Sequence, residues 1–234
     1  HAIDTYLPKL VKAGQRVAIC DQLEDPKLTK KIVKRGVTEL VTPGIAFNDQ
    51  ILDHKNNNFL GAIYLEGKHS GIAFIDVSTG EFYAAQGDID YIEKLLQSFK
   101  PNEIIVQKNK QTKFKELFGE KHYITTFDDW VFTSDFTYNL LLKHFNTSSL
   151  KGFGVDELKS AIIASGAAMH YVFETQHERV SHISKITRIE EDRHVWLDRF
   201  TIRNLEIISS LNENGLSLFD VLDNTSSPMG ARML

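Results

Sequence analysis

The sequence contains a single cysteine, Cys20, among its 234 residues. One thiol excludes a disulfide within the chain and every zinc site that needs several cysteines. Because disulfide-free chains are typical of reducing compartments, we expect a cytoplasmic protein. The sequence also lacks an apolar run of about eighteen residues, the length that a membrane-spanning helix requires. Its charged opening, HAIDTYLPKLVKAG, is unlike a secretory signal.

An excess of positive charge is also missing. Lys and Arg number 27 against 31 Asp and Glu, which gives a formal net charge of −4, whereas DNA-binding domains are usually basic. We therefore expect most of the surface not to contact DNA. One short segment is an exception, because it concentrates five cations that either form a solvated face or contact DNA phosphates: Lys27, Lys30, Lys31, Lys34 and Arg35.

Both ends of the sequence look interrupted. The spacing of Ile3, Leu7, Leu10 and Val11 indicates a helix already under way at the first residue. The other end, ARML, has neither a glycine cap nor a polar tail. We therefore expect a piece of a longer protein.

The first part of the sequence, residues 1–47, is expected to be the remainder of an α/β domain. Gly14 ends the opening helix, and strands are expected at 16–20 and 37–41. Thr42-Pro43-Gly44 stops the second strand. The polar stretch that follows includes three consecutive asparagines, and it predicts a linker over residues 48–57.

Residues 58–188 predict a ribonuclease-H-like domain, a mixed five-stranded sheet with flanking helices. Its first three strands are joined by turns too short for a crossover, which makes them antiparallel neighbours. A helix with one apolar face then leads to a strand, and a second helix leads to another, an arrangement that favours parallel pairing. The expected elements are strands at 59–65, 71–77, 81–86, 103–106 and 123–125, with helices at 89–99 and 110–118.

Further helices are expected towards the end of the sequence. Thr133 or Ser134 is positioned to cap one of them, and Asp156 to cap a long one that runs to about Gln176. The long helix is rich in small residues, which permits close packing against the sheet. Residues 189–234 predict the start of a separate helical domain, with helices at 197–211 and from residue 219.

Asp76 is the strongest candidate for metal chemistry, because it ends the central strand of the expected sheet. A two-metal nuclease site needs several carboxylates that converge, and the available companions are Glu81, Asp88 and Glu103. The alternative is a structural role, in which Asp76 accepts hydrogen bonds from the backbone of the following turn, Ser78-Thr79-Gly80. We favour the turn and expect no catalytic, metal or cofactor-binding residues in this chain.

Two other motifs fail on spacing. His177 and His182 lie five residues apart, whereas a zinc-protease helix needs histidines four apart to share a face. Gly61, Gly67 and Lys68 nearly spell a phosphate loop, but the two glycines are one residue too far apart and His69 replaces the required hydroxyl residue. We therefore expect no nucleotide site and no enzymatic activity in this chain.

Six separated segments, in order and at matching spacing, resemble the MutS family of DNA mismatch-repair proteins. They are HAIDTYLPKLVKAGQRVAICDQLEDP (1–26), GVTELVTPG (36–44), DVSTGEF (76–82), GFGV (152–155), LDRFTIRNLEI (197–207) and VLDNTSSPMGARML (221–234). The resemblance places the end of a mismatch-binding domain, a connector domain and the start of a core domain in this order.

The resemblance implies a parent protein that recognises mispaired or unpaired bases in double-stranded DNA as a homodimer. It also implies a DNA-dependent ATPase that exchanges ADP for ATP, with Mg, and recruits the partner MutL. The connector of this family is ribonuclease-H-like without nuclease activity and offers MutL a docking surface. By resemblance, that surface falls around Asn139, Leu140 and Lys143, although Leu140 is equally well explained as core.

The family reads a mismatch with the phenylalanine of a Gly-Asp-Phe-Tyr-Glu motif, and Gly80-Glu81-Phe82-Tyr83-Ala84 is deceptively similar. Ala84 stands where the glutamate should be, so we interpret Phe82 as a packing residue. Two rival functions remain at this point: a metal-dependent ribonuclease-H-like nuclease, and a structural spacer with no partner of its own.

Overall fold

The computed structural model describes residues 2–24, 32–45, 57–67, 69–176, 180–190, 197, 199–212, 215–227 and 230. The chain divides into two compact units, one of residues 1–52 with 58–189 and one of residues 53–57 with 190–234. Within the first unit we call residues 2–45 the hairpin segment and residues 58–189 the sheet domain. Among the described helices, none is both long and apolar enough to cross a membrane.

The hairpin segment consists of helix α1 (Ala2–Lys12) and the antiparallel strands β1 (Val17–Gln22) and β2 (Arg35–Val41). Gly14 ends the helix with a φ of 78°, a conformation that glycine adopts without steric cost. The pairing starts with Val17 opposite Val41 at the base of the hairpin. The predicted helix and both predicted strands are confirmed.

The sheet domain contains a six-stranded mixed sheet in the order β7-β6-β3-β4-β5-β8. The antiparallel neighbours are β3–β4 and β4–β5, whereas β3–β6, β6–β7 and β5–β8 are parallel. All five predicted strands are present, but the sequence missed the sixth, because a two-residue edge strand has no periodicity to detect. The strands are β3 (Phe59–Tyr64), β4 (Ser70–Asp76), β5 (Glu81–Gly87), β6 (Glu103–Gln107), β7 (Ile124–Phe127) and β8 (Thr187–Arg188).

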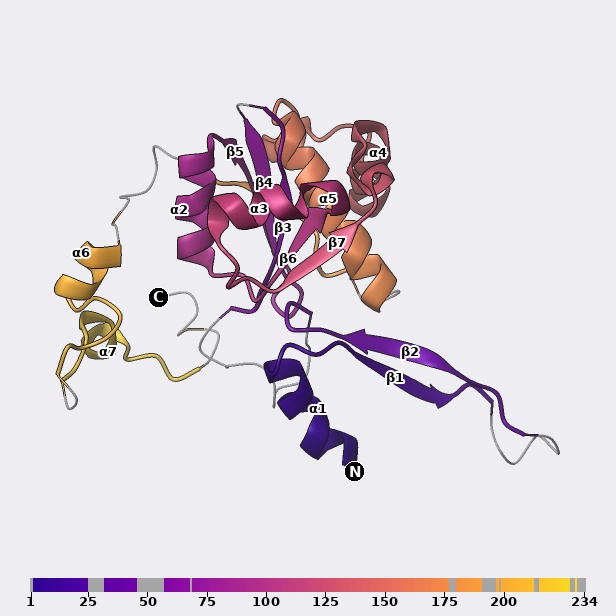
Figure 1. The fold of residues 1–234 in the computed structure, drawn as a ribbon, viewed down its shortest axis with the longest axis horizontal. Helices are drawn as coiled ribbons and strands as arrows, with labels where there is room; N and C mark the ends of the chain where they lie inside the picture. Colours follow the sequence, from indigo (N-terminus) through magenta and orange to yellow (C-terminus); the bar gives the residue numbers. More distant parts are fainter. Residues whose placement is uncertain are drawn as a thin grey trace. The chain divides into compact units, whose positions relative to one another are not determined.

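Helices cover both faces of this sheet (Figure 1). One face packs against α2 (Ile89–Phe99) and α3 (Gln111–Phe118), and the other against α5 (Lys159–Gln176), with α4 (Ser134–Phe145) lying on α5. Because side chains alternate along a strand, each strand supplies both cores. Phe59, for example, packs against Phe99 of α2, whereas its neighbour Leu60 belongs to the core on the α5 face. Short 3-10 helices complete the domain: η1 (Lys108–Lys110), η2 (Asp129–Phe132) and η3 (Lys151–Phe153).

The small residues of α5 do allow close packing, as the sequence predicted. A Cβ on Gly71 of β4 would lie 2.0 Å from the carbonyl carbon of Ser160, so the start of α5 lies directly on the sheet. Gly166 differs from the prediction, because its neighbour is Thr137 of α4, at 2.3 Å from a Cβ placed there. The small stripe of α5 therefore serves a helix as well as the sheet.

The predicted helix caps were partly wrong. Asp156 lies three residues before α5 and accepts a hydrogen bond from the Tyr138 hydroxyl at 2.9 Å, so it does not cap the helix. Thr133 is the residue before α4, but its hydroxyl donates to the carbonyl oxygen of Trp130. In both cases a tertiary or local partner competes for the side chain that spacing alone assigned to a cap.

The second unit contains α6 (Arg199–Asn204) and α7 (Leu218–Leu222). The helix predicted over 197–211 was too long. Glu206 has a φ of 48°, and its N–H and that of Ile207 bond the carbonyls of Arg203 and Ile202, the pattern of a Schellman stop. The helix predicted from residue 219 is confirmed, and Ser217 and Asp220 cap it reciprocally.

Candidate functional site

The exit of the hairpin segment is embedded in the sheet domain. Thr42 and Ile45 bond each other's backbone across the turn Thr42-Pro43-Gly44, at 3.2 and 3.1 Å. Thr42 and Ile45 are fully buried, and Ile45 is part of the core between the sheet and α5. A turn that the sequence marked only as the end of a strand is thus a structural part of the next domain.

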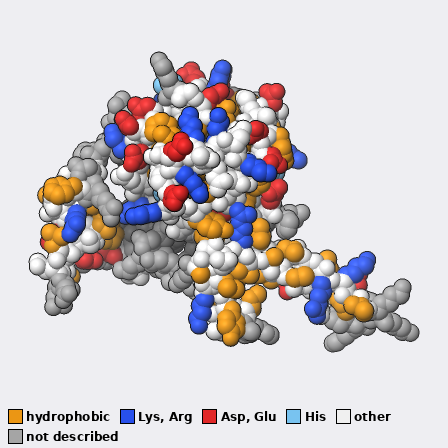
Figure 2. Space-filling view, in the orientation of Figure 1, with side chains coloured by type: hydrophobic (Ala, Val, Ile, Leu, Met, Phe, Trp, Pro, Cys, Tyr) orange, Lys and Arg blue, Asp and Glu red, His pale blue; other side chains and the backbone are white. Residues whose placement is uncertain are grey.

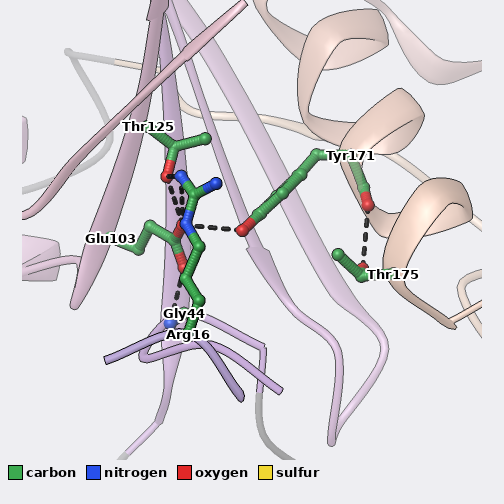
Figure 3. Close-up of polar contacts among 6 residues, drawn as sticks. All are labelled: Arg16, Gly44, Glu103, Thr125, Tyr171 and Thr175. Atoms are coloured by element: carbon green, nitrogen blue, oxygen red, sulfur yellow. Dashed lines mark hydrogen bonds and ion pairs between the residues drawn. The ribbon is translucent and has the colours of Figure 1, made fainter. Parts of the chain in front are cut away.

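Glu103, the first residue of β6, receives this turn. Its side chain is fully buried, and its Oε2 accepts a hydrogen bond from the Gly44 N–H at 3.1 Å (Figure 3). Its Oε1 accepts from the Tyr171 hydroxyl at 2.8 Å and from the Thr125 hydroxyl. One carboxylate therefore joins the hairpin segment, β7 and α5.

Position 44 requires a glycine because the turn lies so close to Glu103. A Cβ at Gly44 would lie 2.7 Å from the Cβ of Glu103 and 3.0 Å from a methyl group of Leu60. Real side chains do not pack at 2.7 Å, so any other residue would push the turn away from β6. The close approach of the turn to the side chains of Glu103 and Leu60 explains the glycine better than backbone conformation does.

Arg16 adds a second connection from the hairpin segment. Its guanidinium donates to the Thr125 hydroxyl and lies 3.9 Å from Oε1 of Glu103. Partial burial lowers the pKa of Arg16, but the nearby oxygens of Tyr171, Tyr123 and Glu103 raise the pKa by more. The guanidinium is therefore a permanent cation. The Thr125 hydroxyl accepts its hydrogen bond and in turn donates one to the Glu103 carboxylate.

Tyr171 contributes a permanent neutral donor from α5. Burial raises the pKa of its phenol, and the adjacent Glu103 carboxylate raises the pKa further, more than Thr42 and Arg16 lower it. The hydroxyl therefore keeps its proton and donates a hydrogen bond to Glu103. An isolated buried carboxylate costs several kcal/mol, about the order that such a set of donors can offset.

The other carboxylate candidates do not converge on a metal site. Oδ1 of the buried Asp76 accepts from the Ser78 N–H at 2.9 Å, and Oδ2 from the Asn58 N–H at 2.9 Å. Asp88 caps α2 by accepting from the Tyr91 N–H. Asp76 is thus the turn residue that we favoured, and the described residues contain no group of three or more metal-binding side chains.

The register of the sheet explains why Asp76 and Glu103 stay apart. Asp76 is paired with Phe59 and Glu103 with Leu60, which are consecutive residues of β3. Paired residues point to the same face, and consecutive ones to opposite faces. The two carboxylates therefore lie at the same end of the sheet but on opposite faces.

Comparisons with known proteins agree with this architecture. The profile described as MutS domain II matches residues 58–184, and that of MutS domain I matches residues 1–50. The chain belongs to the MutS family. It is 58% identical over 234 residues to the DNA mismatch repair protein MutS of Parabacteroides distasonis, and 59% and 56% identical to those of Flavobacterium johnsoniae and Cytophaga hutchinsonii. Each match covers 100% of this chain and 27% of the relative.

In this MutS chain Phe82, which lies in the motif similar to the family's mismatch reader, is a core residue. Phe82 is 1% exposed and faces Phe145 of α4, with ring centroids 6.3 Å apart. The interpretation of Phe82 as a packing residue is confirmed. His182 binds the Val77 carbonyl oxygen through its Nε2 at 2.6 Å, and His177 lies outside the described residues.

Of the five clustered cations, the structure describes two. Lys34 is exposed and forms an ion pair with Glu24 at 3.7 Å, and Arg35 is the exposed first residue of β2. Lys27, Lys30 and Lys31 lie outside the described residues, as does most of the predicted linker. On the visible face of the sheet domain, Lys and Arg are interspersed with Asp and Glu (Figure 2), as the balanced composition led us to expect.

The residues assigned by resemblance to MutL docking lie on α4. Asn139 and Lys143 are exposed and one helical turn apart, so they share a face. Leu140 is half-buried and packs against the core on the α5 face. Leu140 is therefore explained by packing, whereas Asn139 and Lys143 are free to take part in a docking surface.

The sequence did not predict that Glu103 joins the hairpin segment to the sheet domain. We call this set of contacts the junction; its residues are Glu103, Gly44, Arg16, Thr125 and Tyr171. The sequence indicated Glu103 only as a companion of Asp76, and Arg16 only as part of a strand. The available signal was a carboxylate directly before the apolar run of residues 104–106, since a carboxylate buried with such a run needs buried partners. The sequence could not identify those partners, because they lie far from Glu103 along the chain.

Proposed function

We propose that this chain is the part of a DNA mismatch-repair protein that joins the mismatch reader to the core and ATPase domains and transmits signals between them. The boundaries we propose are 1–47 for the end of the mismatch-binding domain, 48–57 for a linker, 58–188 for the connector and 189–234 for the start of the core. The observation that carries this proposal is the buried attachment of the Thr42–Ile45 turn to Glu103.

The parent protein would recognise mispaired or unpaired bases as a homodimer and respond to ATP and ADP with Mg. The family membership and the names of the relatives support that role. The chain itself would not read mismatches, because Phe82 is buried and cannot stack beside a base. Any DNA contact would come from the cations of the segment 27–35, through phosphates, and would weaken steeply with salt.

MutL would dock on the exposed side of α4, around Asn139 and Lys143. Their exposure on one helical face supports this assignment. Leu140 would contribute little, since its side chain is directed to the core. The nuclease alternative gains no support, because Asp76 and Glu103 face opposite sides of the sheet.

Fluorescence anisotropy with matched and G·T-mismatched duplexes, at low and high salt, tests the division of labour. The isolated chain should bind both duplexes equally and weakly, whereas the intact protein should prefer the mismatch. A tenfold preference by the isolated chain, about 1.4 kcal/mol, would contradict the proposal. Binding of MutL to the intact protein should weaken in Asn139→Ala and Lys143→Glu but persist in Glu157→Lys, a change at an exposed residue outside α4.

A further inference from the structure

Glu103 contacts the hairpin segment on both sides of the hairpin's base. Gly44 follows the end of β2, and Arg16 directly precedes the start of β1. Both reach the same carboxylate, Gly44 through Oε2 and Arg16 by the ion pair to Oε1 and through Thr125. A single contact would leave the hairpin free to pivot, whereas contacts next to the base of each strand oppose rotation.

We propose that Glu103 is a positioning residue that sets the orientation of the mismatch-reading domain on the connector. This inference rests on the proposed function, because it gives the transmission of signals a physical element. Burial strengthens the arrangement, since water cannot replace the lost partner of a fully buried carboxylate. Ile45, fixed in the core next to Gly44, keeps the turn in place.

The chemistry of the site calls for a carboxylate. Both oxygens of Glu103 accept hydrogen bonds, and every neighbour that bonds them is a donor. A glutamine loses the charge that attracts Arg16, and its NH₂ group faces either the Gly44 N–H or the hydroxyls of Tyr171 and Thr125, which would have to turn round and accept. The orientation that keeps the Tyr171 and Thr125 bonds sets this NH₂ against the Gly44 N–H. Glu103→Gln should therefore release the hairpin segment selectively and preserve the sheet domain.

Gly44→Ala should also release the hairpin segment, but by a steric effect. The added methyl group would collide with the Cβ of Glu103 and displace the turn without altering the carboxylate. Thr175→Val is the matched control. Thr175 is buried, and its hydroxyl donates to the carbonyl oxygens of Tyr171 and Val172 within its own helix α5, so its loss costs stability without removing a group that bonds Glu103 (Figure 3).

The test measures a distance distribution in the intact protein by pulsed electron resonance. Spin labels are attached at Lys9→Cys on α1 and Lys113→Cys on α3, two exposed positions, with the exposed Cys20 changed to serine. With labelled protomers diluted into unlabelled protein, the unmodified junction should give one narrow peak for the distance within a protomer, and Thr175→Val should keep it even though its Tm falls. Glu103→Gln and Gly44→Ala should both lose the narrow peak.

A narrow peak in folded Glu103→Gln and Gly44→Ala proteins would overturn the positioning role, as would a broad peak in the unmodified protein. Mismatch preference is measured on the same unmodified sample. A narrow peak without mismatch preference would contradict the proposed function and leave the fixed orientation standing. The two inferences therefore fail by different results.

Discussion

Asp76 and Glu103 are both fully buried carboxylates at the same end of one sheet, yet they stabilise different things. Asp76 bonds backbone groups of Ser78 and Asn58, which belong to its own turn and to the adjacent strand end. Glu103 bonds groups from positions 44, 125 and 171 and lies beside Arg16. A local set of partners stabilises a turn, whereas a set of distant partners joins segments that lie far apart in the sequence.

The comparison predicts its largest effect at Glu103. Glu103→Leu should lower the free energy of unfolding by about 3–5 kcal/mol, because it leaves the Arg16 cation and buried donors without their acceptor. Urea unfolding of the chain, followed by circular dichroism, measures this loss. A loss below about 1 kcal/mol would mean that the junction contributes nothing beyond ordinary packing.

Asp76→Asn should have a smaller effect, about 1 kcal/mol, as expected for weakened local hydrogen bonds. The amide still accepts through one oxygen, so the turn should survive. No cleavage of DNA or RNA should occur with Mg²⁺ or Mn²⁺ before or after the change. Metal-dependent cleavage that disappears in Asp76→Asn would restore the nuclease alternative.

Most helices and strands of the sheet domain could be predicted from the sequence, because short stretches of residues determine where they begin and end. Pro101 stops the helix before β6, and the turn Ser78-Thr79-Gly80 joins β4 to β5 as expected. What failed depends on tertiary partners or on very short elements: the strand Thr187–Arg188, the stop at Glu206 and the role of Asp156. The junction at Glu103 belongs to the same class, because its partners lie up to 68 residues further along the chain.

Histidines on the α3 and α5 sides of the sheet predict a weaker, pH-dependent effect. Burial lowers the pKa of His122, His144 and His170 below the ordinary value of about 6.5. Their neutral forms are favoured in the folded state, so the unfolded chain binds more protons below that pH. Stability should therefore be complete above about pH 6.5 and decline as the pH falls towards the lowered folded pKa values.

Thermal unfolding between about pH 7.5 and about pH 5.5 measures this decline. The fall in Tm should be smaller than the effect of Asp76→Asn, and His144→Asn should reduce it. His144 is suitable for this purpose because its Nε2 bonds the Ile183 carbonyl oxygen away from the junction. A Tm that rises as the pH falls would contradict the assignment of these histidines as half-buried groups that are neutral in the folded state.

A double-mutant cycle between Arg16 and Glu103 tests the account most directly. The cycle compares the unfolding free energies of Arg16→Met, Glu103→Gln and the double variant with that of the unchanged chain. We predict a coupling energy of about 0.5 kcal/mol or more, because Arg16 is partly exposed but shares the carboxylate and Thr125 with the sheet domain. Losses that add to within about 0.3 kcal/mol would show that the hairpin segment and the sheet domain are not joined through Glu103.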